Sequence, residues 1–198
     1  MDRANRRLPG IGWLALGWVG ILILPWDGDD AGVFALEWLR SWPAGAGGSA
    51  LGQAVLGGRY WLLPLALPLV LALLPVRRSE LSRRDGTLLA ALGLLALSGL
   101  LVVALSIDLR GWTWSFPEAL FGARPRRNPG LGLGALAYGL AALMLLCRGL
   151  AARGACAGDF FTASMLGIVV AVLAIFVLYP LCRMGLSVFQ TPRGAFAP

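Results

Sequence analysis

Long apolar segments alternate with short polar ones along this chain of 198 residues. An apolar helix of about 20 residues rises about 30 Å, which matches the hydrocarbon thickness of a bilayer. The pattern therefore predicts an all-α, polytopic membrane protein with about five transmembrane helices plus short interfacial segments. The predicted spans are residues 11–26, 60–76, 87–107, 130–147 and 160–189.

Aromatic residues in the connecting segments favour the membrane interface. Residues 33–42 place Phe34 and Trp38 on one side of a helix, so we predict a short helix lying in the interface. Residues 109–127 surround Pro117 with tryptophan and phenylalanine. About ten such residues cannot cross a bilayer, so we expect an interfacial or re-entrant hairpin on the outer surface. The first span has further aromatic anchors at Trp13, Trp18 and Trp26.

Proline and glycine residues inside the predicted spans indicate how those spans pack. The second span contains Pro64, Pro68 and Pro75, so we predict a kinked helix whose freed carbonyl groups are satisfied by neighbouring helices. The third and fourth spans contain small residues, which let helices approach closely. We expect their glycines to mark packing faces. These are Gly93, Gly99, Gly130, Gly132, Gly134 and Gly139.

Composition supports a membrane location. Hydrophobic residues make up 58% of the chain and charged residues 14%, which is more apolar surface than one soluble core of this size can cover. The formal net charge is +7, and all 17 basic residues are arginines. They cluster at the ends of the apolar segments, where they anchor helices to lipid headgroups. We therefore predict a lipid bilayer as partner and no nucleic acid.

The distribution of arginines gives an orientation. With the amino terminus inside, the inner segments hold nine arginines and the outer segments hold seven. The densest charge on short inner loops and the acidic residues at 27–37 favour a cytoplasmic amino terminus. The basic cluster Arg124 to Arg127 counts against this orientation. We predict a cytoplasmic amino terminus and an outer carboxyl terminus.

The sequence offers few residues for catalysis or metal binding. Histidine is absent, and the chain has neither a phosphate-binding loop nor paired carboxylates within a span. Cys147, Cys156 and Cys182 lack a metal-ligand spacing, and we assign them no function. We predict no enzymatic activity, no cofactor and no metal site. Arg183 is the charged residue deepest inside a predicted span and is the candidate for a functional intramembrane charge.

Three segments are informative beyond their hydrophobicity, and the polar and aromatic patterns of the first two are not dictated by bilayer constraints. They are LRGWTWSFPEALFG at 109–122, GLAARGACAGDFF at 149–161 and IFVLYPLCRMGLSVFQTPRGAF at 175–196. Together they resemble the amino-terminal region of bacterial iron(III) ABC-transporter permeases, the inner-membrane components of binding-protein-dependent transport systems. The last segment is the most specific. Its apolar helix, ending in a proline, a basic residue and a Ser-Phe pair, is similar to the first core helix of these permeases.

The resemblance implies two regions: a four-span accessory membrane region at residues 1–158, and a span similar to the first core helix at 159–198. It implies a permease component of an ABC importer for ferric iron in the bacterial inner membrane. A cytoplasmic ATPase subunit and a periplasmic substrate-binding protein would be its partners. The family's ATPase-coupling EAA...G loop is missing here, so we expect an amino-terminal fragment or truncated product.

The alternative is a small five-span membrane scaffold or assembly protein with no transport activity. Such a protein would pack against its partner through small residues of the third and fourth spans, including Gly93 and Gly99. The iron assignment rests on resemblance alone, because the spans lack the oxygen ligands that ferric iron favours. Thiamine or a polyamine stays open as the substrate.

Overall fold

The computed structural model describes residues 3–27, 48–78, 81–108, 111–112, 118–119, 121 and 130–188, with the backbone alone at 3–9, 107–108, 111–112, 183 and 186–188. Most of these residues are helical, as predicted. The α-helices are α1 (Arg3–Leu22), α3 (Ala50–Val55), α4 (Ala66–Val76), α5 (Arg83–Ser106), α7 (Leu133–Ala152), α8 (Phe160–Leu173) and α9 (Tyr179–Val188). Shorter elements are the 3-10 helices η1 (Tyr60–Leu65) and η2 (Ala155–Gly158), the π-helical turn η3 (Ala174–Leu178), and the strands β1 (Ile107–Asp108) and β2 (Gly111–Trp112).

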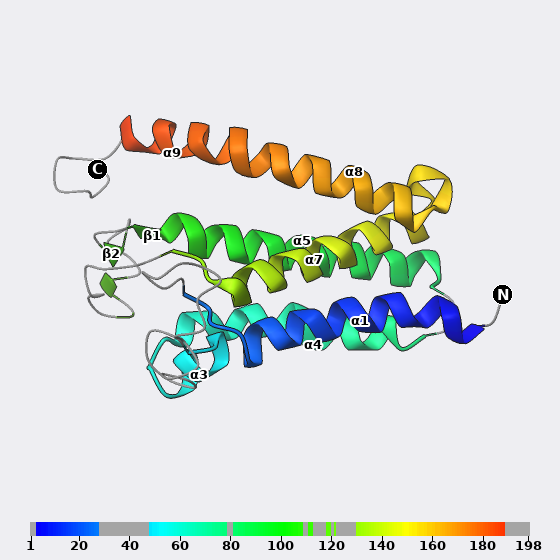
Figure 1. The fold of residues 1–198 in the computed structure, drawn as a ribbon, viewed down its shortest axis with the longest axis horizontal. Coiled ribbons are helices and arrows are strands. Elements are labelled where there is room, and N and C mark those ends of the chain that lie inside the picture. Colours follow the sequence, from blue (N-terminus) through cyan, green and yellow to red (C-terminus); the bar gives the residue numbers. More distant parts are fainter. Residues whose placement is uncertain are drawn as a thin grey trace.

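The long helices lie side by side and alternate in direction along the chain (Figure 1). The start of α1, the connection from α4 to α5, and η2 share one end of the bundle, which we call the amino-terminal end. The opposite end, which we call the α3 end, holds α3 and the β1–β2 hairpin. Helix α7 packs against both α1 and α5, and α8 leads back along the outside of this group.

Glycines allow α7 to approach its two neighbours closely. A Cβ on Gly20 of α1 would lie 2.7 Å from the carbonyl oxygen of Gly134, and one on Gly93 of α5 would lie 2.6 Å from the backbone nitrogen of Leu146. Real Cβ atoms do not approach backbone so closely, so only glycine fits at these positions. A Cβ on Gly99 would lie 3.0 Å from Leu65 Cδ2. The predicted packing faces therefore exist at these glycines, and they are used inside the chain. The prediction is wrong for Gly130, which lies before the start of α7 with a φ of +93° and has nothing within 4 Å of where a Cβ would be.

The first helix lies earlier in the chain than predicted, at Arg3–Leu22 instead of residues 11–26. It ends at Leu22 rather than at residue 26, and the chain then turns across the α3 end. Trp26 is 1% exposed and packs edge-to-face on Tyr138, with ring centroids 5.8 Å apart. Its backbone N–H donates to the Gly48 carbonyl. The expectation that Trp26 anchors the interface is wrong, because tertiary packing places its ring in the protein core.

The proline-rich second segment changes its helical form, as its composition predicts. Residues Tyr60–Leu65 form the 3-10 helix η1, with Pro64 inside it, and α4 follows at once. The Tyr138 hydroxyl donates a hydrogen bond of 2.9 Å to the Leu65 carbonyl at the junction. A side chain of α7 therefore satisfies backbone in this irregular helix, which is how proline is accommodated inside a membrane bundle.

Among the described residues, three helical segments are long and apolar enough to cross a membrane: Arg83–Ser106, Leu133–Ala152 and Phe160–Cys182. This is fewer than the five predicted. Two further apolar helices, Gly10–Leu22 and Tyr60–Val76, are shorter. The first is short because arginines occupy the opening turns of α1 and the helix stops before Pro25. The chain is thus consistent with a membrane protein.

Other boundaries differ from prediction at the helix ends. Helix α5 begins four residues earlier than expected, at Arg83, and α7 continues through Arg148 to Ala152. The short helix α3 was not predicted. The expected interfacial helix at 33–42 lies outside the described residues, as does most of the segment 109–127. β1, just before that segment, pairs antiparallel with β2 inside it, and Phe121 packs edge-to-face on Trp61.

Candidate functional site

The fifth helical segment is largely uncovered by the described parts of the chain. Helices α8 and α9, joined by η3, follow one another without a break from Phe160 to Val188. The segment contacts the bundle near its start, where Ala163 and Ser164 are buried against α7. Beyond that point most of its described apolar side chains are exposed, including Phe176 at 75% and Met184 at 67%.

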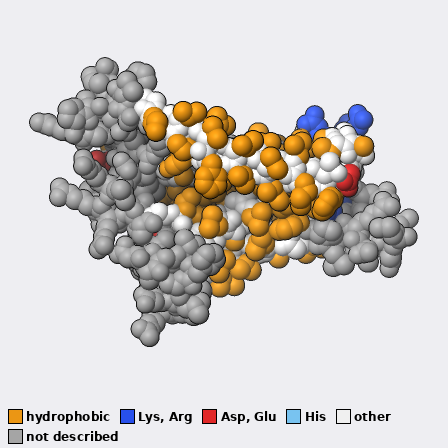
Figure 2. Space-filling model, turned by 45° about the horizontal axis from the view of Figure 1, so that its top comes forward, with side chains coloured by type: hydrophobic (Ala, Val, Ile, Leu, Met, Phe, Trp, Pro, Cys, Tyr) orange, Lys and Arg blue, Asp and Glu red, His pale blue; other side chains and the backbone are white. Residues whose placement is uncertain are grey.

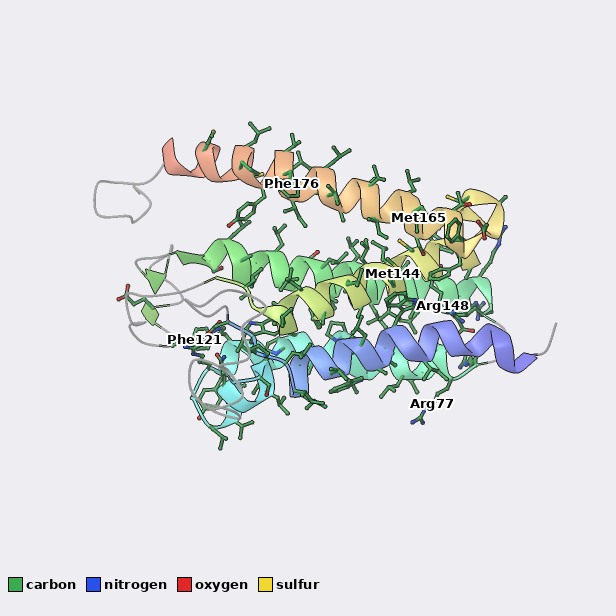
Figure 3. All side chains as sticks on the ribbon, viewed as in Figure 1. Arg77, Phe121, Met144, Arg148, Met165 and Phe176 are labelled. Atoms are coloured by element: carbon green, nitrogen blue, oxygen red, sulfur yellow. The ribbon has the colours of Figure 1, made fainter. Side chains whose placement is uncertain are left out.

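The figures show the same separation. The helix carrying Met165 and Phe176 runs along the outside of the bundle, away from α1 and α4 (Figure 3). Hydrophobic side chains cover the middle of the face in Figure 2, and basic side chains gather at the amino-terminal end. An exposed apolar surface of this size marks contact with lipid or with other protein helices.

Two features make this uncovered helix unlike a simple lipid-facing span. Pro180 lies inside α9 and has no backbone N–H to donate, and just before it Tyr179 N donates to Ala174 O in a π-type turn. Such turns in α-helices are frequent at functional sites. Arg183 follows within the same helix, and its side chain lies outside the described residues. Its role as an intramembrane charge stays a prediction.

A buried polar cluster holds the α3 end together. Arg59 Nη1 donates to Asp27 Oδ2 and to Gln53 Oε1, and Gln53 Nε2 donates to the Gly48 carbonyl at 2.8 Å. The Asp27 side chain is 11% exposed, and Gln53 is 2% exposed. The Asp27 carboxylate is paired with a guanidinium, and the Gln53 side-chain amide uses both its oxygen and its nitrogen in hydrogen bonds. The cluster therefore has a structural role: it joins the segment after α1 to α3 and to the start of η1.

At the amino-terminal end, acidic side chains serve as helix caps. Ser82 and Asp85 form a capping box at the start of α5: Asp85 N donates to Ser82 Oγ at 3.1 Å, and Ser82 N donates to Asp85 Oδ2 at 3.3 Å. Arg78 Nη1 also donates to Asp85 Oδ1 at 2.6 Å. Asp85 is therefore fully engaged with its own helix and the preceding loop.

Asp159 caps α8 in a similar way. Its carboxylate accepts hydrogen bonds from the Thr162 hydroxyl and from the backbone N–H groups of Phe161 and Thr162. The side-chain bond from Thr162, followed by the backbone bond from the same residue, lowers the pKa of Asp159 below its ordinary value. The carboxylate is exposed and stays ionised at neutral pH.

Arg148 lies within α7 rather than in the predicted loop. It is half-buried, and its side chain reaches α1, where a Cβ on Gly10 would lie 2.9 Å from its Cζ. Gly10 thus makes room for the guanidinium. By the helical rise, Arg148 is about 6 Å from the end of α7 at Ala152, a depth from which an arginine reaches the interface.

The described residues hold no group of three histidine, cysteine, aspartate or glutamate side chains placed to bind a metal ion. The three cysteines are free thiols. Cys147 is buried, Cys156 is half-buried and Cys182 is exposed on α9. The polar side chains described above instead cap helices and join neighbouring segments.

Sequence reasoning missed two contacts that hold the bundle. Tyr138 bonds to Leu65, which is 73 positions away, and Arg59 bonds to Asp27, 32 positions away. A lone tyrosine in an apolar helix, facing a proline-rich one, was the available signal for the first contact. No comparable local signal paired Arg59 with one particular carboxylate.

The described residues therefore form a mostly helical chain that is consistent with a membrane protein, and its segment Phe160–Cys182 is largely uncovered. Comparison of the chain with protein-family models, with curated proteins and with solved structures finds no match.

Proposed function

We propose that this chain is a transmembrane permease component of an ABC importer for ferric iron in the bacterial inner membrane. The proposal rests on the resemblance of residues 109–122, 149–161 and 175–196 to such permeases, taken together with the helical architecture. A cytoplasmic ATPase would supply the energy, and a periplasmic binding protein would deliver the ion.

The uncovered helix from Phe160 to Val188 is the observation that carries the proposal. Its segment resembles the first core helix of the permeases, and it leaves the bundle after its opening turns. Pro180 and Arg183 both raise the free energy of a helix that faces only lipid. Proline frees a backbone carbonyl that needs a hydrogen-bond donor, and arginine carries a charge that needs polar neighbours. Further membrane helices packed on this segment would supply those neighbours and complete a translocation path.

The proposed topology has five crossings with a cytoplasmic amino terminus. Six residues of η1 and eleven of α4 rise about 28 Å, close to the hydrocarbon thickness, although they number only 17. Helix α1 lies beside α7, which is long enough to cross. If α1 and the η1–α4 segment both cross, Gly57 and Arg78 lie on opposite sides of the membrane.

Alkaline phosphatase fusions test this topology, because the enzyme is active only outside the cytoplasm. Fusion after Gly57 should give high activity, and fusion after Arg78 should give low activity. Equal activity at the two positions would show that η1–α4 does not cross. A fusion after Arg153, predicted to be inside, serves as a further reference of low activity.

The scaffold alternative would need a different binding surface from the one predicted for it. A partner bound through Gly93 and Gly99 needs those residues on a free surface, yet a Cβ at either position would press on α7 or on Leu65 of the same chain. A partner of a scaffold would have to use α8 and α9 instead. No described contact favours this function over transport.

Deletion of the gene tests transport against the alternative. Under the permease proposal, growth should fail with ferric iron as the sole iron source and recover when the gene is returned. Growth with ferrous iron is the control, since it enters by other routes. Unchanged growth on ferric iron would refute the iron proposal, whatever the topology.

A further inference from the structure

The amino-terminal end of the bundle carries a group of exposed arginines, which we call the arginine patch. It consists of Arg77, Arg83, Arg84 and Arg153. The two described carboxylates at this end do not neutralise it, because Asp85 and Asp159 are engaged in helix caps and Asp85 is already paired with Arg78. Among the described side chains, this end therefore has a clear excess of positive charge.

Helix packing brings the patch together from three segments. A Cβ on Gly86, in the first turn of α5, would lie 2.9 Å from the Cβ of Ala152, at the end of α7. Arg83 and Arg84 open α5 and Arg153 follows α7, so they flank the same close contact. The ion pair from Arg78 to Asp85 brings the end of α4, and with it Arg77, close to the start of α5.

The α3 end is different in the part of the chain that the structure describes. Arg59 is paired with Asp27 there, and Glu118 is exposed. The described charges are thus polarised along the bundle axis, in the direction of helices long enough to cross a membrane. Arg83 and Arg153 lie at the ends of α5 and α7. If these helices cross a bilayer, both arginines are at the depth of the lipid phosphates.

We propose that the arginine patch is a binding surface for the headgroups of anionic phospholipids. Guanidinium groups form paired hydrogen bonds to phosphate oxygens, and a negatively charged leaflet attracts basic residues at its surface. A zwitterionic headgroup has the same phosphate with a compensating ammonium, so the patch should prefer phosphatidylglycerol over phosphatidylcholine. This inference depends on membrane insertion and not on iron transport.

Native mass spectrometry of the purified chain in neutral detergent, titrated with each lipid, measures this preference. Each arginine near an anionic surface contributes about fivefold, so wild type should bind phosphatidylglycerol at least about tenfold more tightly than phosphatidylcholine. The variant R83Q/R84Q/R153Q should bind the two lipids within about twofold. The matched control R124Q/R126Q/R127Q removes the same charge from another segment and should keep the preference.

Three results would overturn the proposal. They are equal binding of the two lipids by wild type, an equal loss of preference in the control variant, and competition by millimolar glycerol phosphate, which would indicate a site for free phosphate. Circular dichroism checks that the variants are folded. If the triple glutamine variant does not fold, the salt dependence of wild type serves as the test. Its preference for phosphatidylglycerol should disappear at about 1 M salt. A preference unaffected by salt would contradict a surface of exposed arginines.

Discussion

Replacement of Tyr138 by phenylalanine tests whether a buried hydrogen bond joins α7 to the proline-rich helix. The substitution keeps the ring, and so keeps its edge-to-face contact with Trp26. It removes only the hydroxyl that donates to the Leu65 carbonyl at 2.9 Å. Tyr138 is 0% exposed, so neither water nor lipid headgroups can replace the lost donor.

The expected loss follows from this geometry. An unsatisfied buried carbonyl costs about 1–3 kcal/mol in proteins, whereas interhelical hydrogen bonds in membrane bundles average about 0.6 and reach about 1.7 kcal/mol. The Leu65 carbonyl lies where the 3-10 helix becomes α4, so local backbone bonding is already irregular. We expect Tyr138→Phe to lower the free energy of unfolding by about 1–2 kcal/mol.

Unfolding in mixed micelles by sodium dodecyl sulfate, followed by circular dichroism, measures this difference. Tyr60→Phe is the matched control, because Tyr60 is 59% exposed and should change the free energy of unfolding by less than about 0.3 kcal/mol. A loss below about 0.3 kcal/mol for Tyr138→Phe, or an equal loss for the two variants, would refute the reasoning.

Three further predictions concern packing, capping and transport. Gly93→Ala should lower the free energy of unfolding by at least about 2 kcal/mol, because the added Cβ meets backbone atoms of α7. Gly12 has open space around it, so Gly12→Ala should change the free energy of unfolding by less than about 1 kcal/mol in the same assay. The pKa of Asp159 is lowered by the hydrogen bonds from Thr162, so its stabilising effect is complete above the ordinary value of 3.8 and is lost as pH falls through the lowered pKa. The difference in unfolding midpoint between wild type and Asp159→Ala should therefore be largest at pH 6 and become smaller as the pH falls below 3.8; a constant difference would contradict the assignment. Arg183→Gln should reduce ferric iron uptake at least about tenfold and Arg183→Lys should reduce it less, if the charge acts within the membrane; uptake unchanged in both would exclude that role.

The hydrophobic pattern predicts the helices well, because a run of apolar residues has few other structures available in a bilayer. Each of the five apolar segments contains a helix, and Pro64 correctly indicates where the second one becomes irregular. The ends were less predictable. Trp26 and Arg148 both looked like boundary residues, yet one is buried against Tyr138 and the other continues α7.

The contacts between segments required the structure. Ser49 and Gln53 lie in a stretch with no apolar period, and α3 forms there because Ser49 caps it and the Gln53 side chain bonds to the Gly48 carbonyl. Small-residue spacing indicated close packing at Gly93, but it could not distinguish a partner within the chain from a separate protein. That choice depends on which helices the loops bring together.

Transport of radiolabelled ferric iron by intact cells tests the central proposal most directly. We predict that energy-dependent uptake is lost when the gene encoding this chain is deleted and is restored when the gene is returned. Uptake that is the same with and without the gene would contradict the assignment of this chain to a ferric iron importer.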